Sequence, residues 1–240
     1  MNHRTRVAES KRAATRHKLL DAAMRVFSDH TGPAPVIDDV IHEAQVSRGT
    51  FYNYFDSVDE LLAAISQELS DQMTTGILPV YDVLQEPWQR ISVGFRLFMV
   101  RAMLDRKWAG FVTRVDAWQH NTLVAGYIES DLAEGKARGQ FAFDRLDVAT
   151  DFVMGASAYC IQTIRQGVPE PNLYMDAQVR MALTCVGADR KVSEQGVAFS
   201  LAHLQAWATR EREAGAHTWA FNLNSPEGKR FLAHSPAAYE

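Results

Sequence analysis

The sequence has few residues that cross-link a chain or bind metals, and it has no long apolar run. Only two cysteines are present, Cys160 and Cys185, which is too few for a disulfide framework or a thiolate metal site, so we expect two buried thiols. The longest useful uncharged run, residues 152–164, is shorter than the ~18 apolar residues of a membrane-spanning helix. Residues 1–20 lack the apolar stretch of a secretory signal. These absences predict a cytoplasmic protein with no membrane partner.

Patterns typical of enzymes are also missing. The eight histidines are scattered, with no pair at the i, i+4 spacing of a zinc helix. The sequence contains no phosphate loop, no dinucleotide fingerprint and no G-x-S-x-G elbow. Asp144 and Asp147, beside Arg145, are better explained as residues that cap a helix start than as paired catalytic carboxylates. We therefore expect no catalytic residues, no metal and no cofactor.

The charge is unevenly distributed along the chain. Apolar residues make up 47% and charged residues 22%, the balance of a chain that folds around a core. The formal net charge is −4, yet residues 1–20 carry six Lys and Arg residues against Glu9 alone. A basic N-terminal arm on an acidic body indicates an anionic partner that is met at one end.

Apolar residues recur at helical spacing along almost the whole chain, whereas alternating strand patterns are hard to find. The sequence therefore predicts an all-α fold. The last 25 residues give no clear pattern. The expected helices are a first helix through residues 20–27 that ends before Gly32-Pro33, then 37–44, 47–54, 57–73, stripes over 91–103 and 111–118, and helices at 123–136, 144–165, 173–186 and 193–212.

The most informative segment is Val36–Phe55, VIDDVIHEAQVSRGTFYNYF. Two short helices joined by about three residues make a helix-turn-helix, whose second helix can enter the major groove of DNA. Such a helix needs small residues near its start and polar groups facing outward. A glycine inside a helix, such as Gly49, lowers helix stability by roughly 1 kcal/mol relative to alanine. Its presence therefore indicates that the helix backbone must come close to the duplex. The outward set is Ser47, Arg48, Gly49, Thr50, Tyr52, Asn53 and Tyr54, and the inward anchors are Val46, Phe51 and Phe55.

Residues 12–70 resemble the DNA-binding domain of the TetR family of transcriptional regulators. The resemblance is carried by VSRGTFYNYF at residues 46–55, by Leu61-Leu62 after it, and by Phe27 and Ala44 before it. It implies a homodimer with an N-terminal three-helix domain over residues 1–57. A larger helical domain, residues 58–240, would hold a small-molecule effector and the dimer interface, with helix 57–73 connecting the two domains.

Three positions depart from the family pattern. Gln45 stands where the turn usually has glycine, so a left-handed backbone there would be less comfortable. Pro35-Val36 replaces the usual Thr or Ser cap, and Val58 replaces a lysine near the DNA backbone. The missing lysine is expected to lower affinity and its salt dependence.

The resemblance also implies roles for individual residues. Arg48 and Thr50 are expected to contact base edges, with Tyr52 as a third. Ser47, Asn53 and Tyr54 are expected to contact phosphates, and Gly49 to allow the close approach. The arm residues expected at the DNA backbone or adjacent minor groove are Arg12, Arg16, His17 and Lys18.

The C-terminal part resembles the family only in outline. Helix 144–166 is apolar on most sides, so we expect it to be buried on more than one face and to pair with its copy across a two-fold axis. Its partner in a four-helix bundle would be helix 172–186 or helix 193–210. The expected interface residues are Phe152, Gly155, Ala156, Tyr159, Leu201 and Leu204.

Aromatic residues and methionines are abundant between the signature and these helices. One interpretation makes them the lining of an apolar ligand cavity with His120 or Asn121 as polar groups, and the other makes them ordinary core. The residues concerned are Trp88, Phe95, Met99, Met103, Trp108, Phe111, Trp118 and His120, together with Phe98.

These observations predict a ligand-responsive, DNA-binding transcriptional regulator. It would act as a dimeric repressor, released from a palindromic operator in double-stranded DNA by a small, largely apolar effector. The alternative is a helical adaptor or protein-interaction dimer that has lost DNA binding, motivated by Gln45 and Val58, and an all-helical enzyme is a distant third. An adaptor would have no reason to keep the outward set Arg48, Thr50 and Tyr52.

Overall fold

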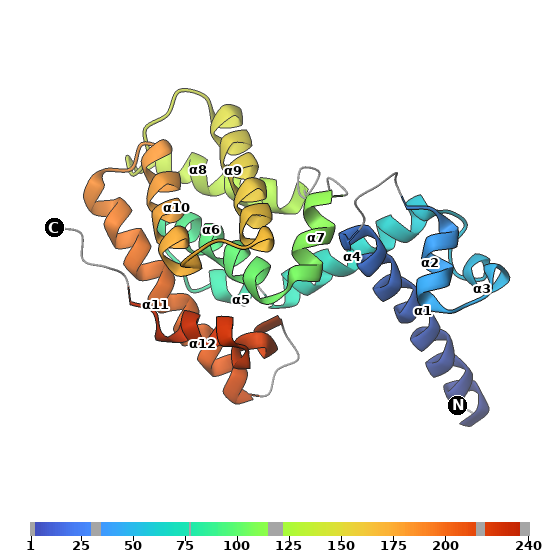
Figure 1. Ribbon diagram of the computed structural model, residues 1–240. Coiled ribbons are helices and arrows are strands. Elements are labelled where there is room, and N and C mark those ends of the chain that lie inside the picture. The colour runs from blue at the N-terminus through green and yellow to red at the C-terminus, as the bar shows by residue number, and fades with distance from the viewer. Residues whose placement is uncertain (1–2, 30–34, 77, 115–121, 215–218, 236–240) are drawn as a thin grey trace.

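The computed structural model describes residues 3–29, 35–76, 78–114, 122–214 and 219–235 (Figure 1). Within these ranges the chain forms helices and no strand, which confirms the predicted all-α fold. The elements are α1 (His3–Asp29), α2 (Ile37–Ala44), α3 (Arg48–Tyr52), α4 (Val58–Gly76), α5 (Leu78–Tyr81), α6 (Pro87–Leu104), α7 (Arg106–Arg114), α8 (Thr122–Ala137), α9 (Leu146–Gln166), α10 (Pro171–Cys185), α11 (Arg190–Ala214), the 3-10 segment η1 (Trp219–Asn224) and α12 (Pro226–Ala233).

The N-terminal helices form a small unit of their own. Helix α1 packs against α2 and α4, and α2 packs against α3. Helix α1 begins at His3, so the basic residues continue this helix, and its first turns project beyond α2 and α3 (Figure 1). The buried side chains of the unit are Leu19, Leu20, Ala23, Phe27, Val40, Ala44, Phe51, Phe55, Leu61 and Ile65.

The larger part of the molecule is built around α6. Helices α8, α9, α10 and α11 all pack against it, and almost all of its residues are buried. Arg96 lies at 0% exposure and forms an ion pair with Asp176 of α10 at 2.7 Å, while its Nε donates to Ser200 of α11 at 2.8 Å. Burial lowers the pKa of Arg96, and the charge of Asp176 opposes that shift. A buried, hydrogen-bonded ion pair therefore fixes α6, α10 and α11 in one arrangement.

The last part of the chain, which the sequence left unassigned, is also folded. The Gln205 amide donates to the carbonyls of Phe231 and His234 at 2.7 and 2.9 Å, and a His234 ring nitrogen lies 2.8 Å from Asp176. These polar contacts hold α12 against α10 and α11.

One expectation is wrong. Cys160 is buried, but Cys185 at the end of α10 is exposed, because it falls on the outer side of that helix. Helix α9 buries Val153 and Ile161 on one face only, and its opposite face carries exposed Phe152 and Tyr159. An apolar helix in one copy of the chain thus has a face without cover. None of the described helices is long and apolar enough to cross a membrane.

Candidate nucleic-acid interface and ligand cavity

The turn between α2 and α3 is built by local backbone contacts. Val36 offers no side-chain cap to α2, but the Asp39 carboxylate accepts a hydrogen bond from the Val36 N–H at 2.8 Å. Gln45 ends α2 in the left-handed region (φ 50°, ψ 50°), which explains why glycine would be easier there. Ser47 then caps α3, because its Oγ accepts from the Thr50 N–H at 3.0 Å. The cap predicted at Ser47 is confirmed.

Gln45→Gly should raise the free energy of unfolding by about 0.5–1 kcal/mol. A residue with a Cβ in the left-handed region lowers stability by about 1–2 kcal/mol, which glycine would recover. The greater freedom of glycine in the unfolded chain offsets part of that recovery. Urea unfolding of the full chain measures the change, with Gln45→Ala as a control that should stay close to the parent. A glycine variant less stable than the parent would contradict the strain assigned to this turn.

Helix α3 is anchored by its aromatic residues and open on its other side. Phe51 is 0% exposed and Phe55 is 2% exposed, whereas Tyr52 is 45% exposed and Asn53 is also exposed. A Cβ added at Gly49 would meet only the Ser47 Oγ, at 3.9 Å. The protein's own packing therefore does not require glycine at this position, and the open surface above it is free for a partner.

Arg48 is held by α2 in this structure. Its guanidinium donates to the Asp38 carboxylate at 2.8 Å, and both side chains are more than half exposed. A hydrogen bond with Tyr52 and the charge of Asp38 raise the pKa of Arg48. An exposed ion pair of this kind contributes little to stability, so it can open when a stronger anion is offered.

The arm and α3 come together on one surface. The Arg12 guanidinium lies 5.6 Å from the centre of the Tyr54 ring, and the Arg16 guanidinium lies at the same distance from the Phe55 ring. Lys18 is exposed, while His17 Nδ1 lies 3.2 Å from Asp21 Oδ2. Lys11, Arg12, Thr15, Asn53 and Tyr54 line an open hollow of about 430 Å³. Basic and amide groups around one hollow suit a phosphate group.

Helix α4 starts without the lysine expected from the resemblance. Val58 is half-buried against the core of the unit, and Ser57 caps the helix by accepting from the Glu60 N–H at 3.1 Å. The Glu60 carboxylate in turn accepts from the Asp56 N–H at 2.6 Å. This start is secured by packing and capping and offers no cation to DNA.

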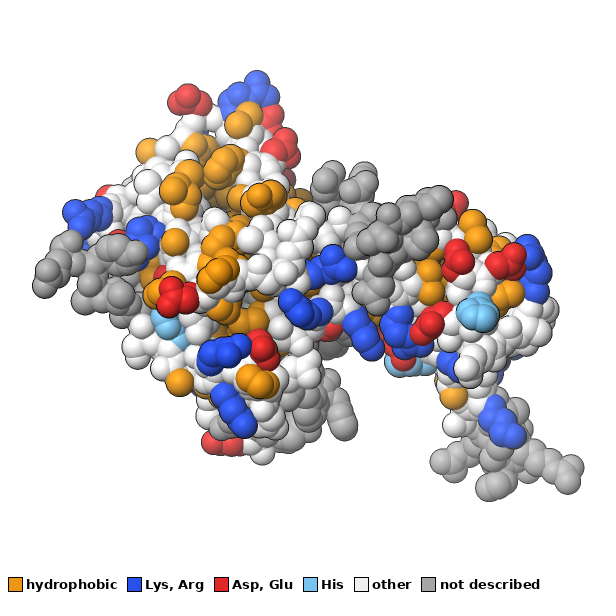
Figure 2. All heavy atoms as spheres, in the orientation of Figure 1, with side chains coloured by type: hydrophobic (Ala, Val, Ile, Leu, Met, Phe, Trp, Pro, Cys, Tyr) orange, Lys and Arg blue, Asp and Glu red, His pale blue; other side chains and the backbone are white. Residues whose placement is uncertain are grey.

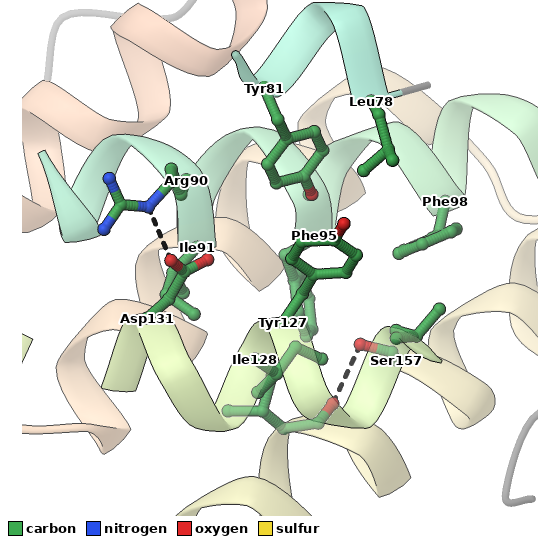
Figure 3. A pocket seen from close by; sticks show the side chains of 13 residues that line it. Leu78, Tyr81, Arg90, Ile91, Phe95, Phe98, Tyr127, Ile128, Asp131 and Ser157 are labelled. Carbon is green, nitrogen blue, oxygen red and sulfur yellow. Dashed lines mark hydrogen bonds and ion pairs between the residues drawn. The ribbon is translucent and has the colours of Figure 1, made fainter. Parts of the chain in front are cut away.

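A second feature is a cavity inside the larger part, between α5, α6, α8 and α9 (Figure 3). The space open to the centres of water molecules is about 30 Å³. Its lining is Leu78, Tyr81, Arg90, Ile91, Gly94, Phe95, Phe98, Val124, Tyr127, Ile128, Asp131, Val153 and Ser157.

One end of the cavity is polar. The Arg90 Nε donates to Asp131 Oδ1 at 2.5 Å, and a second Arg90 nitrogen contacts Glu134. Burial raises the pKa of Asp131 to about 6, against the opposing effect of Arg90. Burial, and then the charge of Asp131, raises the pKa of Tyr81. The cavity thus combines aromatic walls with a carboxylate and a phenol.

The expected ligand residues fall into several places. Phe95 and Phe98 line the cavity, whereas Met99 and Phe111 are buried in the core at 0% exposure. Trp88 packs edge-to-face against Phe199, and Met103 borders a different hollow near the start of α7. Trp118, His120 and Asn121 lie outside the described residues.

The cavity also contains residues that the sequence interpretation missed. Asp131 follows Val124 and Ile128 on the buried stripe of α8, and a carboxylate on an apolar stripe is a signal that could have identified it. Arg90 is likewise a charged residue next to an apolar stripe, because it directly precedes the stripe of α6. Among the described residues, no group of three or more His, Cys, Asp or Glu side chains is arranged to hold a metal ion.

Helix α7 connects this cavity to the N-terminal unit. The Trp108 ring stacks on Phe98, with ring centres 6.3 Å apart, and the Arg101 guanidinium lies 4.5 Å over the same indole. Two residues later a Cβ at Gly110 would lie only 2.6 Å from the Ser28 Cβ, so α1 and α7 are in close contact. The Arg165 guanidinium of α9 donates to the Ser28 carbonyl as well. Side-chain contacts therefore run from the cavity wall to the end of α1.

The exposed face of α9 continues onto α10. Apolar side chains gather over the part of the molecule that these helices form (Figure 2). Gly155 is exposed and open, with nothing within 4 Å of an added Cβ, and Ala156 is half-buried. The exposed large apolar residues of the two helices are Val148, Phe152, Tyr159, Leu173 and Met181.

Leu201 and Leu204 do not belong to that face. Both are 1% exposed and lie in the chain's own core, in the helix that packs on α6. This corrects the sequence-based assignment, because a side chain without exposed surface cannot contact a second subunit. Helix α10, rather than α11, is the neighbour of α9 with an open apolar stripe.

Comparisons with known proteins agree with this geometry. Residues 19–65 match the family model for bacterial regulatory proteins, tetR family. A stretch of 71 residues is 32% identical to the HTH-type transcriptional repressor LfrR of Mycolicibacterium smegmatis (strain ATCC 700084 / mc(2)155). This match covers 30% of the chain and 36% of LfrR, about a third of that protein's length.

Two solved structures are similar over most of the chain. The structure of RolR in complex with the ligand resorcinol is 24% identical in sequence to this chain, with a TM-score of 0.54. The match covers 79% of this chain and 95% of the RolR chain. RolR without ligand is 22% identical, with a TM-score of 0.55, and covers 76% and 96%. These likenesses show the fold. The family match covers the segment that contains the helix-turn-helix of α2 and α3, so the similarity to tetR-family regulators is established for that segment.

Proposed function

We propose that this protein is a homodimeric, effector-responsive DNA-binding regulator that acts as a repressor. One observation carries the proposal: α3 turns Arg48, Gly49 and Tyr52 outward while Phe51 and Phe55 are buried beneath it. An adaptor would gain nothing from that arrangement. The departures at Gln45 and Val58 leave it intact, since both lie outside α3.

In the proposed complex α3 lies in the major groove. Arg48 leaves Asp38 to contact a base edge, and Thr50 and Tyr52 contact neighbouring bases. Phosphates are bound, and the register on the duplex is fixed, by two groups of residues. These are Ser47, Asn53 and Tyr54 around α3, and Arg12, Arg16 and Lys18 of α1. The hollow between Arg12 and Tyr54 supports the phosphate role.

The proposed dimer pairs the open faces of α9 and α10 with their copies. Phe152, Gly155, Ala156 and Tyr159 then lie at the two-fold axis, joined by Met181 of α10. A symmetric pair of recognition helices reads a palindrome with half-sites about one helical turn, ~34 Å, apart. We place the division between a DNA-binding domain and an effector domain at the start of α4, near residue 57.

The proposed effector is a small, largely apolar molecule that binds in the cavity of α5, α6, α8 and α9. RolR, whose fold is similar, is known in complex with resorcinol, which supports a ligand of one-ring size. An effector that binds better to the form with wrongly spaced recognition helices must weaken DNA binding. The contacts from Phe98 through Trp108 and Gly110 to Ser28 supply a route for that coupling.

A gel-shift assay with the DNA that flanks the protein's own gene tests the proposal. We expect a discrete complex that weakens steeply with salt, because phosphate contacts release counterions. A large excess of unrelated DNA should not compete it away. Binding that does not distinguish the flanking DNA from unrelated DNA would refute specific recognition.

A further inference from the structure

Two polar groups on the cavity wall have no hydrogen-bond partner among the described residues. One is the Tyr81 hydroxyl, which points into the space between α5 and α6 (Figure 3). The other is Asp131 Oδ2, since Arg90 takes only Oδ1. A hydroxyl can donate and accept, whereas a carboxylate only accepts. A ligand group that complements this wall therefore donates a hydrogen bond to Asp131 and accepts one from Tyr81.

The cavity also limits the size of its ligand. The space open to the centres of water molecules is only about 30 Å³, so a ligand that fills it must be small. Four rings, those of Tyr81, Phe95, Phe98 and Tyr127, stand around it, and aromatic side chains suit a flat ring.

The charges around Asp131 exclude an anionic ligand. Every donor group of Arg90 is engaged: Nε with Asp131, Nη2 with Glu134, and Nη1 with the carbonyls of Leu84 and Gln85 at 3.3 Å. Arg90 is thus not free to bind a carboxylate, and Asp131 would repel one. Because Arg90 already neutralises Asp131, a buried cation would not be compensated either.

We propose that the effector is a neutral, single-ring aromatic compound whose ring hydroxyl groups donate to Asp131 and accept from Tyr81. The inference rests on the proposed function, in which this cavity is the effector site. Gly94 makes the arrangement possible, because a Cβ there would lie 1.8 Å from the Tyr81 hydroxyl. Leaving the two groups unpaired is costly, so a ring of equal size without a hydroxyl should bind at least about tenfold more weakly.

Calorimetric titration of the full chain with phenol, toluene, benzoate and benzylamine tests the inference. We expect phenol to bind most tightly and benzoate not at all. Asp131→Asn should abolish the preference for phenol over toluene, because Arg90 holds the amide oxygen and the amide NH₂ then replaces the accepting oxygen. Tyr81→Phe should reduce the preference about threefold to tenfold. Asp82→Asn removes an exposed carboxylate next to Tyr81 and outside the cavity lining, and it should keep the preference.

The pH dependence provides a readout that a structural role would not move. Asp131 faces Arg90 of α6, Glu134 of its own helix and Tyr81 of α5, and its raised pKa of about 6 places its protonation in an accessible range. Only the ionised form accepts strongly. Phenol affinity should be constant above about pH 7 and fall by up to about tenfold per unit below pH 6, and it should be flat in Asp131→Asn.

Equal binding of phenol and toluene overturns the inference. So does a preference for phenol over toluene that survives in Asp131→Asn, and so does binding of benzoate or benzylamine that is tighter than binding of phenol. Failure of all four to bind overturns it too. Thermal melting confirms that each variant is folded, and gel shifts without ligand are run in parallel. Operator binding without phenol preference defeats this inference and leaves DNA recognition standing, whereas loss of operator binding by the parent protein defeats the proposed function.

Discussion

Arg48→Ala is expected to weaken specific DNA binding on the order of 100-fold or more. A bidentate contact between arginine and a base is worth about 1–3 kcal/mol, and a symmetric dimer loses two of them. The loss should be specific, because Arg48 stands at the start of α3 and contributes nothing to the core beneath it. Fluorescence anisotropy with an operator duplex, at one fixed salt concentration, measures the change.

Two further variants separate base recognition from simple charge loss. Asp38→Asn removes the carboxylate that holds Arg48, so affinity should stay equal or rise slightly. Arg12→Ala should weaken binding to all sequences alike and reduce the salt slope by about two per dimer. A change of less than twofold in Arg48→Ala would show that Arg48 does not read the operator.

Phe152→Asp should convert the dimer into monomers and abolish operator binding at concentrations where the parent is bound. Phe152 is 50% exposed in the single chain and lies in the middle of the apolar stripe of α9. Two unpaired carboxylates would be buried at the two-fold axis, each at a cost of several kcal/mol. Because the side chain packs little against its own subunit, the fold should survive. Sedimentation velocity measures the mass.

Val83→Asp is the matched control. Val83 is 66% exposed on the turn after α5, outside α9 and α10, and its replacement adds the same charge to the surface. It should remain dimeric and bind DNA. A dimer that persists in Phe152→Asp would place the interface elsewhere.

The N-terminal unit is the part of the structure that the sequence predicts best. Its helix boundaries follow from local chemistry, such as the Ser47 cap and the proline-rich break before α2, and its core follows from periodic apolar residues. Even the departure at Gln45 is visible in advance, because the family pattern usually has glycine at this position and the backbone there is left-handed. Such features depend on neighbours a few positions away.

The cavity and the dimer face depend on packing between distant segments. Aromatic residue type alone does not separate Phe95, which lines the cavity, from Phe111, which fills the core. Tyr81 and Asp131 line one cavity only because α5 and α8 both lie against α6. Helix α11 shares the apolar spacing of an interface helix, but it packs on α6 in the interior, where the buried Arg96 donates to its Ser200.

Hydroxyl-radical footprinting of the protein on a duplex selected from random sequence tests the central claim most directly. A dimer that presents two copies of α3 predicts a palindromic consensus. Two protected patches should lie about one helical turn, ~10–10.5 base pairs, apart on the same face of the duplex. Both patches should disappear in Arg48→Ala and in Phe152→Asp. A single patch, or a consensus without two-fold symmetry, would contradict the account.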